Sequence, residues 1–207
     1  MELLTGLGLA SSAGLNAYIP LLMAGVLARY TDWFPLGAGW EWLANPAVLI
    51  VLGVLLAVEF LADKIPGVDS VNDVLQTVIR PTAGGITFGA GASTLTAADP
   101  VTTDTVTAAA AGGGEGTMTW VFVIVGAIVA LLFHTLKALV RPLVNTVTVG
   151  IGAPVASVVE DVASFFMAAL AILLPLLIVL LIPLIAMGGV LLLRRGRRRR
   201  AERAATA

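Results

Sequence analysis

The feature that most constrains this chain is a series of apolar runs, each about as long as a bilayer crossing. The strongest runs lie at residues 3–27, 46–62, 118–139 and 154–193. A helix of about 20 apolar residues spans a hydrocarbon core of roughly 30 Å. The chain is 58% hydrophobic, against about 45–50% in a typical soluble domain. The sequence therefore predicts an all-α polytopic membrane bundle of five to six spans, in which residues 1–193 form one domain.

The first run, at residues 3–27, is rich in small residues and carries an amide near its middle. Gly6, Ala10 and Gly14 recur every four residues, so one helix face allows a neighbouring backbone to approach closely. Asn16 needs a hydrogen-bonding partner in lipid, and both a packing role and a binding role stay open for it. Pro20 predicts a kink in this span.

A weaker apolar run at 81–98 is crowded with glycine and threonine, which places it inside the bundle. Just before it, residues 70–79 predict a separate short amphipathic helix that lies at the interface or re-enters the bilayer. Residues 99–117 combine Gly, Ala and Thr with acids and no base. This composition predicts a flexible joint between two halves at 1–98 and 118–193.

Aromatic residues gather in the short loop at 29–45. Trp33, Trp40 and Trp42 lie there together with Tyr30. Such side chains anchor proteins at the level of the lipid headgroups. We favour this anchoring role over an aromatic ligand cage.

Charged and polar side chains gather in two islands, at residues 58–81 and 134–161, in a chain that is only 12% charged. Those of His134, Lys137 and Arg141 fall at helical spacing and share one face. We expect the islands to meet on one side of the bundle and to form, with Asn16, a site for a small solute or ion. The predicted site residues are Asn16, Glu59, Asp63, Lys64, Asp73, Arg80, His134, Lys137, Arg141, Asn145, Glu160 and Asp161.

Most of these residues also have a purely structural interpretation. An intramembrane carboxylate is costly unless it is paired or wet. Glu59 therefore either pairs with Lys137 or Arg141 across the helices, or couples the protein to an ion or proton. Asp63 and Lys64 lie at a predicted helix end, where we favour solvation.

The second island has the same two interpretations. His134 either titrates near neutral pH or packs through a hydrogen bond, and we favour packing. Glu160 and Asp161 lie near a predicted helix start, so they fit charge complementarity at a helix N-terminus as well as a binding role. Ser70 or Ser157 would have to meet His134 to form a nucleophilic site, and no motif supports this, so no catalytic residue is predicted.

The Arg-Pro pair at 80–81 recurs at 141–142, and the similarity extends beyond it. RPTAGGITFGAGA and RPLVNTVTVGIGA agree at six of thirteen positions. Because Gly- and Ala-rich segments also align by chance, this is only a suggestive internal repeat. Repeats related by symmetry are common in small transporters.

Composition excludes several kinds of chemistry. The chain has no cysteine and one histidine, which excludes disulfides, thiolate chemistry and multi-histidine metal sites. It contains no nucleotide-binding loop, zinc-protease signature or nucleophile elbow. We therefore expect no cofactor, no metal and no nucleic-acid partner. Membrane lipids are the expected partners, and a homo-oligomer is compatible with so small a bundle.

The distribution of basic residues predicts the orientation. Seven of the twelve lie between Arg194 and Arg203, so residues 194–207 form a basic tail, which we expect on the cytoplasmic side of the inner (plasma) membrane. If residues 143–159 stay outside the bilayer, five spans result and both islands face the exterior. If that segment crosses, six spans result and the Arg-Pro ends face the cytoplasm.

Several motifs together resemble those of a known family. GLNAYIP, EFLADKIPGVDSVND with IRPTAG, H-x2-KA-x2-R with Asn145, and P-x2-S-x2-ED follow one another from about Gly6 to Leu174. Their order and spacing are similar to those of a prokaryotic integral-membrane family, domain of unknown function 4126. EFLADKIPGVD is the most specific part. The resemblance favours five spans, although TVTVGIGA is more apolar here than in the family, and it implies no activity.

Three hypotheses for function follow. Polar residues on several helices, Gly-rich interior spans and the suggestive repeat favour a transporter or channel for a small polar or ionic solute. The second hypothesis is a membrane scaffold or lipid-binding protein in which Arg80, Lys137 and Arg141 hold anionic headgroups. A lipid-modifying enzyme that uses His134 and a carboxylate is the least favoured class.

Overall fold

The computed structural model describes residues 2–37, 39–63, 68–98, 115–148, 152–174, 182–191 and 194–195. Their elements are α1 (Glu2–Leu15), α2 (Tyr18–Tyr30), the 3-10 helix η1 (Glu41–Ala44), α3 (Pro46–Ala62), α4 (Val68–Ala98), α6 (Glu115–Thr148), α7 (Gly152–Leu173) and a helix at Ile182–Leu191. These ranges contain no strand, so the predicted all-α architecture is confirmed. Lys64, most of the predicted joint at 99–117 and most of the tail lie outside the described residues, as do the side chains of Arg141 and Asn145.

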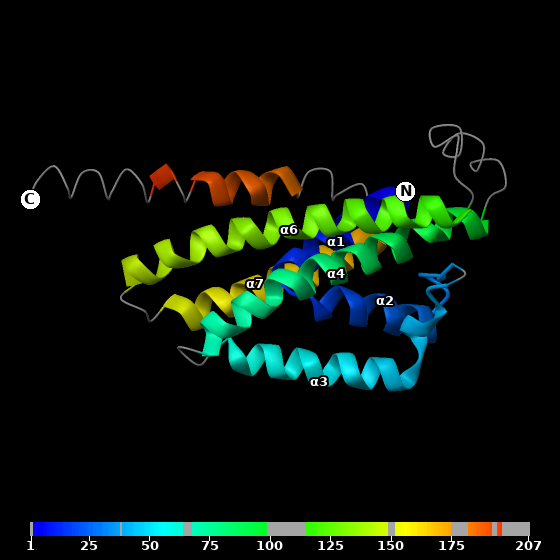
Figure 1. Ribbon diagram of the computed structural model, residues 1–207, viewed down its shortest axis with the longest axis horizontal. Helices are drawn as coiled ribbons and strands as arrows, with labels where there is room; N and C mark the ends of the chain where they lie inside the picture. The colour runs from blue at the N-terminus through cyan, green and yellow to red at the C-terminus, as the bar shows by residue number, and fades with distance from the viewer. Residues whose placement is uncertain are drawn as a thin grey trace, which may run out of the picture.

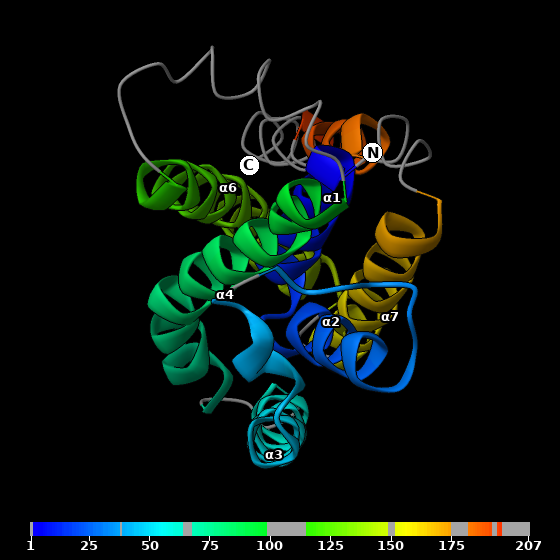
Figure 2. The ribbon, with the colours of Figure 1, turned by 90° about the vertical axis from the view of Figure 1, so that its right-hand side faces the viewer.

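Helix α1 is the centre of the bundle, and α4, α6 and α7 pack around it (Figure 2). Its small residues permit this packing. A Cβ at Gly6 would lie 3.0 Å from the carbonyl oxygen of Phe88, and a Cβ at Gly14 would collide with the carbonyl oxygen of Ala130. The predicted close approach of neighbouring backbones to α1 is therefore confirmed, and such contacts are typical of membrane bundles.

The first apolar run forms a helical hairpin, because the chain reverses between α1 and α2 (Figure 1). Helix α2 returns toward the end of the bundle where α1 begins, and its Gly25 lies there against the Leu43 backbone. The prediction of one helix at 3–27 with a kink at Pro20 is therefore wrong. Pro20 lies in the first turn of α2, where backbone N–H groups have no partner within the helix and proline is tolerated.

Helix α3 forms where the sequence predicts it, at 46–62, and packs mainly on α2 and η1. Its start is set by two residues. The Oδ1 of Asn45 accepts a hydrogen bond from Ala47 N at 2.9 Å, and Pro46 takes the first helical position. Only Leu52 and Glu59 of α3 are buried, so most of this helix faces away from the bundle.

Helix α4 runs without interruption through Pro81, so the prediction of two separate helices at 70–79 and 81–98 is wrong. A proline inside a helix removes a hydrogen bond and clashes with the preceding turn. Here the long contacts of α4 with α1 and α6 offset that cost. The predicted interior position of 81–98 is confirmed as far as Ala92, because most side chains from Ala83 to Ala92 are buried.

Helices α4 and α6 lie side by side and touch through glycine (Figure 1). A Cβ at Gly84 would lie 2.7 Å from the carbonyl oxygen of Gly126. Helix α6 begins at Glu115, within the predicted joint, and continues past the predicted 118–139 to Thr148. The helix boundaries do not follow the suggested repeat, since α4 passes unbroken through 80–92 whereas α6 ends and α7 begins inside 141–153.

The predicted helix at 154–193 is divided in the structure. Helix α7 ends at Leu173, and a separate helix covers Ile182–Leu191. Pro175 follows the end of α7 closely in the sequence, and a proline is expected shortly after a helix C-terminus because it cannot continue the helix. The prediction of one helix that is merely kinked is therefore wrong.

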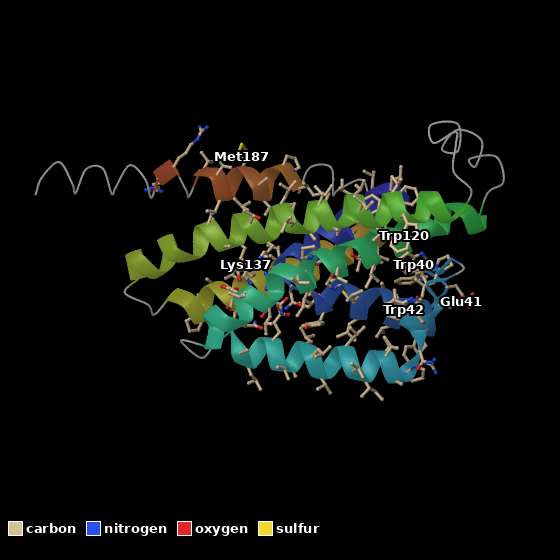
Figure 3. The ribbon with its side chains drawn as sticks, viewed as in Figure 1. Trp40, Glu41, Trp42, Trp120, Lys137 and Met187 are labelled. Carbon is tan, nitrogen blue, oxygen red and sulfur yellow. The ribbon has the colours of Figure 1, made fainter. Side chains whose placement is uncertain are left out.

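The bundle has two distinct ends (Figure 3). Trp40, Trp42 and Trp120 lie at one of them, which we call the tryptophan end. The opposite end, where α3 finishes and α7 begins, we call the polar end. The predicted aromatic belt is only partly exposed, since Trp33 and Trp42 face outward whereas Trp40 is buried in the core.

Apolar side chains cover the outside of the bundle, and polar side chains lie inside it. Val54 on α3, Ile124 on α6 and Phe166 on α7 are more than half exposed, whereas Arg80 and Gln76 are buried. By length and composition, two of the described helical segments are able to cross a membrane, Trp120–Val140 and Pro154–Leu173. In soluble domains the usual pattern is the reverse, because charged and amide side chains are mostly exposed.

Candidate functional site

The reversal between α1 and α2 leaves two helix ends inside the bundle. The last carbonyl oxygens of a helix carry a partial negative charge. At the end of α1, Arg80 Nη1 donates to the Gly14 oxygen at 3.2 Å, and Lys137 Nζ donates to the Leu15 oxygen at 3.4 Å. Two cations, from α4 and α6, therefore cap α1. We name the surrounding group the charged centre: Asn16, Glu59, Arg80, Lys137, Glu160 and Asp161.

Arg80 holds three helices together at the charged centre. Its Nη2 lies 2.9 Å from Glu59 Oε1 on α3, and its Nε donates to Gln76 Oε1 on α4 at 3.4 Å. Arg80 and Glu59 are 0% and 2% exposed. Because removing either ion from water costs several kcal/mol, each of these two charges depends on the other.

The second ion pair joins α6 to α7. Lys137 Nζ lies 2.8 Å from Glu160 Oε2, in an ion pair that does not include a hydrogen bond at that oxygen. The structure thus pairs Lys137 with Glu160 and Glu59 with Arg80, so the predicted Glu59–Lys137 pair is wrong. Lys137 lies toward the polar end of α6, far from the tryptophans (Figure 3).

Asn16 occupies the tip of the hairpin, where its side chain binds the start of α2 and reaches α7. Its Oδ1 accepts hydrogen bonds from Tyr18 N at 3.0 Å and Ile19 N at 3.1 Å, which satisfies the first N–H groups of α2. Its Nδ2 donates to Asp161 Oδ1 at 2.9 Å. The amide that the sequence places in mid-span is therefore the residue that allows the chain to turn there.

Glu160 and Asp161 lie in the third turn of α7, since the helix begins at Gly152. The proposed charge complementarity with the start of their own helix is therefore wrong. Asp161 instead lies beside the start of α2, through its hydrogen bond to Asn16. The positive end of the α2 dipole stabilises a negative charge at this position.

Four buried polar atoms in and beside the charged centre have no hydrogen-bond partner in the described part of the chain. They are Glu59 Oε2, Asp161 Oδ2, His134 Nδ1 and Glu160 Oε2, of which the last lies in the ion pair with Lys137. Leaving such an atom unsatisfied costs about 1–3 kcal/mol, so native proteins contain few of them. Their concentration beside the hairpin tip marks this region as a candidate binding site.

Asp63, Asp73 and His134 lie next to the charged centre. Asp63 is buried and accepts a hydrogen bond from Asn72 Nδ2 at 2.7 Å, so the predicted solvation of Asp63 is wrong. His134 Nε2 lies 3.2 Å from Thr77 Oγ1, and this contact joins the two polar islands. Asp73 is half-buried one turn before Thr77, whose Oγ1 donates to the Asp73 backbone oxygen at 3.0 Å.

The outer surface beside the charged centre remains apolar. Val58 on α3, Val74 on α4 and Val159 on α7 are 56%, 71% and 60% exposed. Val58 and Val159 are sequence neighbours of Glu59 and Glu160 in the charged centre, and Val74 follows the half-buried Asp73. The charged centre therefore lies behind a largely apolar surface.

Two apolar grooves lead toward the charged centre from different sides. The first lies between α2 and α3, has a volume of about 450 Å³ and reaches Asp161. The second lies between α6, α7 and the helix at Ile182–Leu191, has a volume of about 310 Å³ and reaches Lys137 and Glu160. A larger pocket, of about 580 Å³, lies at the tryptophan end against Trp40 and Trp120, away from the described charges.

A family model described as Domain of unknown function (DUF4126) matches residues 3–195. The chain belongs to this family. The match confirms the resemblance and covers the hairpin from Leu3 onward and every residue of the charged centre. Searches of curated proteins and of solved structures gave no significant match. Membership in the DUF4126 family assigns no activity, so the function must be argued from the geometry of the site.

In this DUF4126 protein, the structure brings together most of the predicted site residues. Asn16, Glu59, Arg80, Lys137, Glu160 and Asp161 form the charged centre, and Asp63, Asp73 and His134 flank it. Lys64 and the side chains of Arg141 and Asn145 lie outside the described set. No group of three metal-binding side chains occurs among the residues that are described.

Three partners were not predicted as site residues. They are Asn72, Gln76 and Thr77, which bind Asp63, Arg80 and His134. Their signal in the sequence is the polar face of 70–79, opposite the apolar residues of that stretch. That face points to the charged centre because 70–79 belongs to the long helix α4.

Proposed function

We propose that this protein is a membrane transporter or channel for a small polar or ionic solute, and that the charged centre is its binding site. The observation that carries the proposal is the hairpin α1–α2, whose tip ends among buried charges from α3, α4, α6 and α7. Irregular backbone is tolerated at membrane depth only where it is buried in protein or lines a cavity. Interrupted helices whose ends face charged groups form the solute sites of many transporters.

The apolar exterior supports a position within a bilayer. In the arrangement that we propose, α3, α4, α6, α7 and the helix at Ile182–Leu191 cross the membrane, and α1–α2 is a re-entrant hairpin that enters from the tryptophan end. Exposed Trp33, Trp42 and Tyr30 then lie at one interface, where aromatic side chains are enriched.

The basic tail sets the orientation in this proposal. Arg194 and Arg195 are exposed and follow a helix that runs toward the polar end (Figure 1). Positive charge is retained on the cytoplasmic side, so the polar end faces the cytoplasm. Because the chain lacks cysteine, Glu41→Cys and Arg195→Cys can be labelled separately with an impermeant maleimide in intact cells. We expect label at residue 41 alone, and label at residue 195 alone would reverse the orientation.

Burial of Arg80 disfavours a role for the charged centre in holding lipid headgroups. Arg80 is 0% exposed and bound to Glu59, Gln76 and Gly14. A headgroup would have to displace all three of these groups. A small solute that enters the enclosed site requires a smaller rearrangement.

The proposal is tested by flux in proteoliposomes. Purified protein is reconstituted, and currents on solid-supported membranes are recorded for a panel of inorganic ions, organic cations, organic anions and zwitterions. We compare the protein with Glu59→Gln, Glu160→Gln and the exposed control Arg29→Ala, whose guanidinium contacts only the Ala44 oxygen among the described hydrogen bonds. A current that Glu59→Gln and Glu160→Gln abolish and Arg29→Ala retains supports transport. Folded protein without current for any solute on the panel contradicts it.

A further inference from the structure

Among the described residues, the groove between α2 and α3 combines an apolar wall with a single carboxylate. Leu56, Ala57 and Phe60 of α3 and Ile19 of α2 line it, together with Asp161 of α7. Its volume of about 450 Å³ lies within the range of about 300–1,000 Å³ found for small-molecule sites. The groove is therefore large enough for an organic ligand and has one place that attracts positive charge.

The two neighbouring carboxylates of α7 are in different situations. Glu160 is neutralised by Lys137 at 2.8 Å. Asp161 receives only the Asn16 amide on Oδ1, and its buried Oδ2 has no partner in the described part of the chain. No described lysine or arginine forms an ion pair with Asp161. The groove is thus lined by a carboxylate whose charge is not paired within the described residues.

The chemistry of the wall selects the class of cation. An alkali or alkaline-earth ion requires several oxygen ligands, and the groove supplies one carboxylate among apolar groups. An ammonium or phosphonium ion with apolar substituents matches this groove. Its substituents would pack against the apolar wall, and its charge would lie near Asp161. The ring of Phe60 can also attract a cation through its face.

We propose that the groove between α2 and α3 is a binding site for a lipophilic organic cation, with Asp161 as its counter-ion. The site deepens the proposed function and rests on it for its role, because the cation would be the solute that reaches the charged centre. A neutral lipid chain is the competing occupant. It would fill the same groove, and its affinity would not depend on Asp161.

Equilibrium binding of radiolabelled tetraphenylphosphonium to the purified protein in detergent tests this site without any need for flux. Asp161→Asn removes the charge and keeps an oxygen that accepts from Asn16, so we expect affinity to fall by about tenfold to a hundredfold. Gly53→Leu fills the groove, and a Cβ there has no atom within 4 Å. The matched control is Gly188→Leu, which is equally free of contacts but lies in the second groove.

We expect saturable binding that Asp161→Asn and Gly53→Leu weaken and Gly188→Leu leaves unchanged. Neutral tetraphenylmethane should not compete. Equal affinity in Asp161→Asn, or equal competition by tetraphenylmethane, would overturn the cation site in favour of a lipid groove. If Asp161→Asn fails to fold, Gly53→Leu decides the question alone. Flux of other solutes without phosphonium binding would contradict only this site, and binding without flux of any solute would contradict only transport.

Discussion

Helices are held together in opposite ways in two regions of the molecule. The first, which we call the glycine region, is the contact of α4 with α6 at Gly84 and Gly126, and the second is the charged centre at the tip of α1. At Gly84 and Gly126, the backbones of α4 and α6 are so close that neither position has room for a Cβ. At the charged centre, long side chains bridge the helices, and Arg80 reaches both α1 and α3. The first region depends on the absence of side chains, and the second depends on their charges.

This difference suggests which part of the molecule can change shape. The glycine contacts are close-packed, so a shift there would either collide or open a void. The charged centre contains Glu59 Oε2 and Asp161 Oδ2, which have no partner in the described part of the protein. An incoming ligand or proton can therefore gain interactions there. We expect the glycine region to act as a fixed support and the hairpin tip to rearrange.

The largest expected effect comes from Arg80→Ala. This change leaves buried Glu59 without its ion-pair partner and removes the donor from the Gly14 oxygen. Removing one member of a buried pair typically costs about 3–5 kcal/mol. Denaturant unfolding of the purified protein in micelles, followed by circular dichroism, measures the loss.

The control for this prediction is the double substitution Glu59→Leu with Arg80→Met. It replaces the buried pair by apolar side chains and should recover most of the stability, because paired ions often stabilise a fold no better than apolar packing. Arg29→Ala, at an exposed arginine, should change stability by less than about 0.5 kcal/mol. A loss of stability in Arg80→Ala no larger than in Arg29→Ala would show that the charged centre does not hold the helices.

The next largest effect is expected from Gly126→Ala in the glycine region. Its Cβ would meet the Gly84 carbonyl oxygen and Phe88 Cβ, and overpacking of this kind costs about 1–3 kcal/mol. The matched control is Gly53→Ala on α3, where a Cβ has open space and alanine favours the helix by about 1 kcal/mol. The same unfolding assay applies, and equal stability of the two variants would contradict the close packing of α4 on α6.

The sequence predicts the helices of this fold better than their ends and turns. Helix α3 was predicted to the residue because Asn45 and Pro46 set its start and the charged, Pro-containing stretch after Ala62 sets its end. The predicted division into two helices at Pro81 was wrong because the tertiary packing of α4 outweighs the tendency of proline to end a helix. The reversal at Asn16 was missed because hydropathy measures apolar length, which a hairpin and a crossing helix share.

The members of the charged centre were predicted, but most of their pairs were not. An ionisable residue in an apolar run is rare and therefore conspicuous in a sequence. Pairing depends on which helix faces which, and that follows from the hairpin. Because α1 ends in the middle of the bundle, its carbonyls attract Arg80 and Lys137. These cations then select Glu59 and Glu160 as partners.

A smaller effect is expected from Asn16→Ala at the hairpin tip, which tests the turn without removing a charge. The change removes the acceptor of Tyr18 N and Ile19 N and the donor to Asp161. Loss of a helix cap costs about 0.5–2 kcal/mol. We expect unfolding at lower denaturant and faster hydrogen exchange at the first amides of α2. Unchanged exchange at these amides would indicate that Asn16 does not hold the reversal.

The smallest effect is expected from Ser164→Ala, at a contact that shares features of both regions. Ser12 and Ser164 are small and buried, so α1 and α7 approach closely there, and they also exchange hydrogen bonds. Ser12 Oγ donates to the Ser164 oxygen at 2.8 Å, and Ser164 Oγ donates to the Ser12 oxygen at 3.1 Å. Such bonds between membrane helices contribute about 0.6 kcal/mol on average. The two Oγ atoms also lie 2.8 Å apart, and a double-mutant cycle with Ser12→Ala and Ser164→Ala measures the coupling through this contact. A coupling energy near this value would mean that close packing, as at the glycines, holds α1 against α7. A coupling energy as large as that of Glu59 and Arg80 would instead mean that polar interactions hold these helices together, as in the charged centre, and the two regions would then not differ in kind.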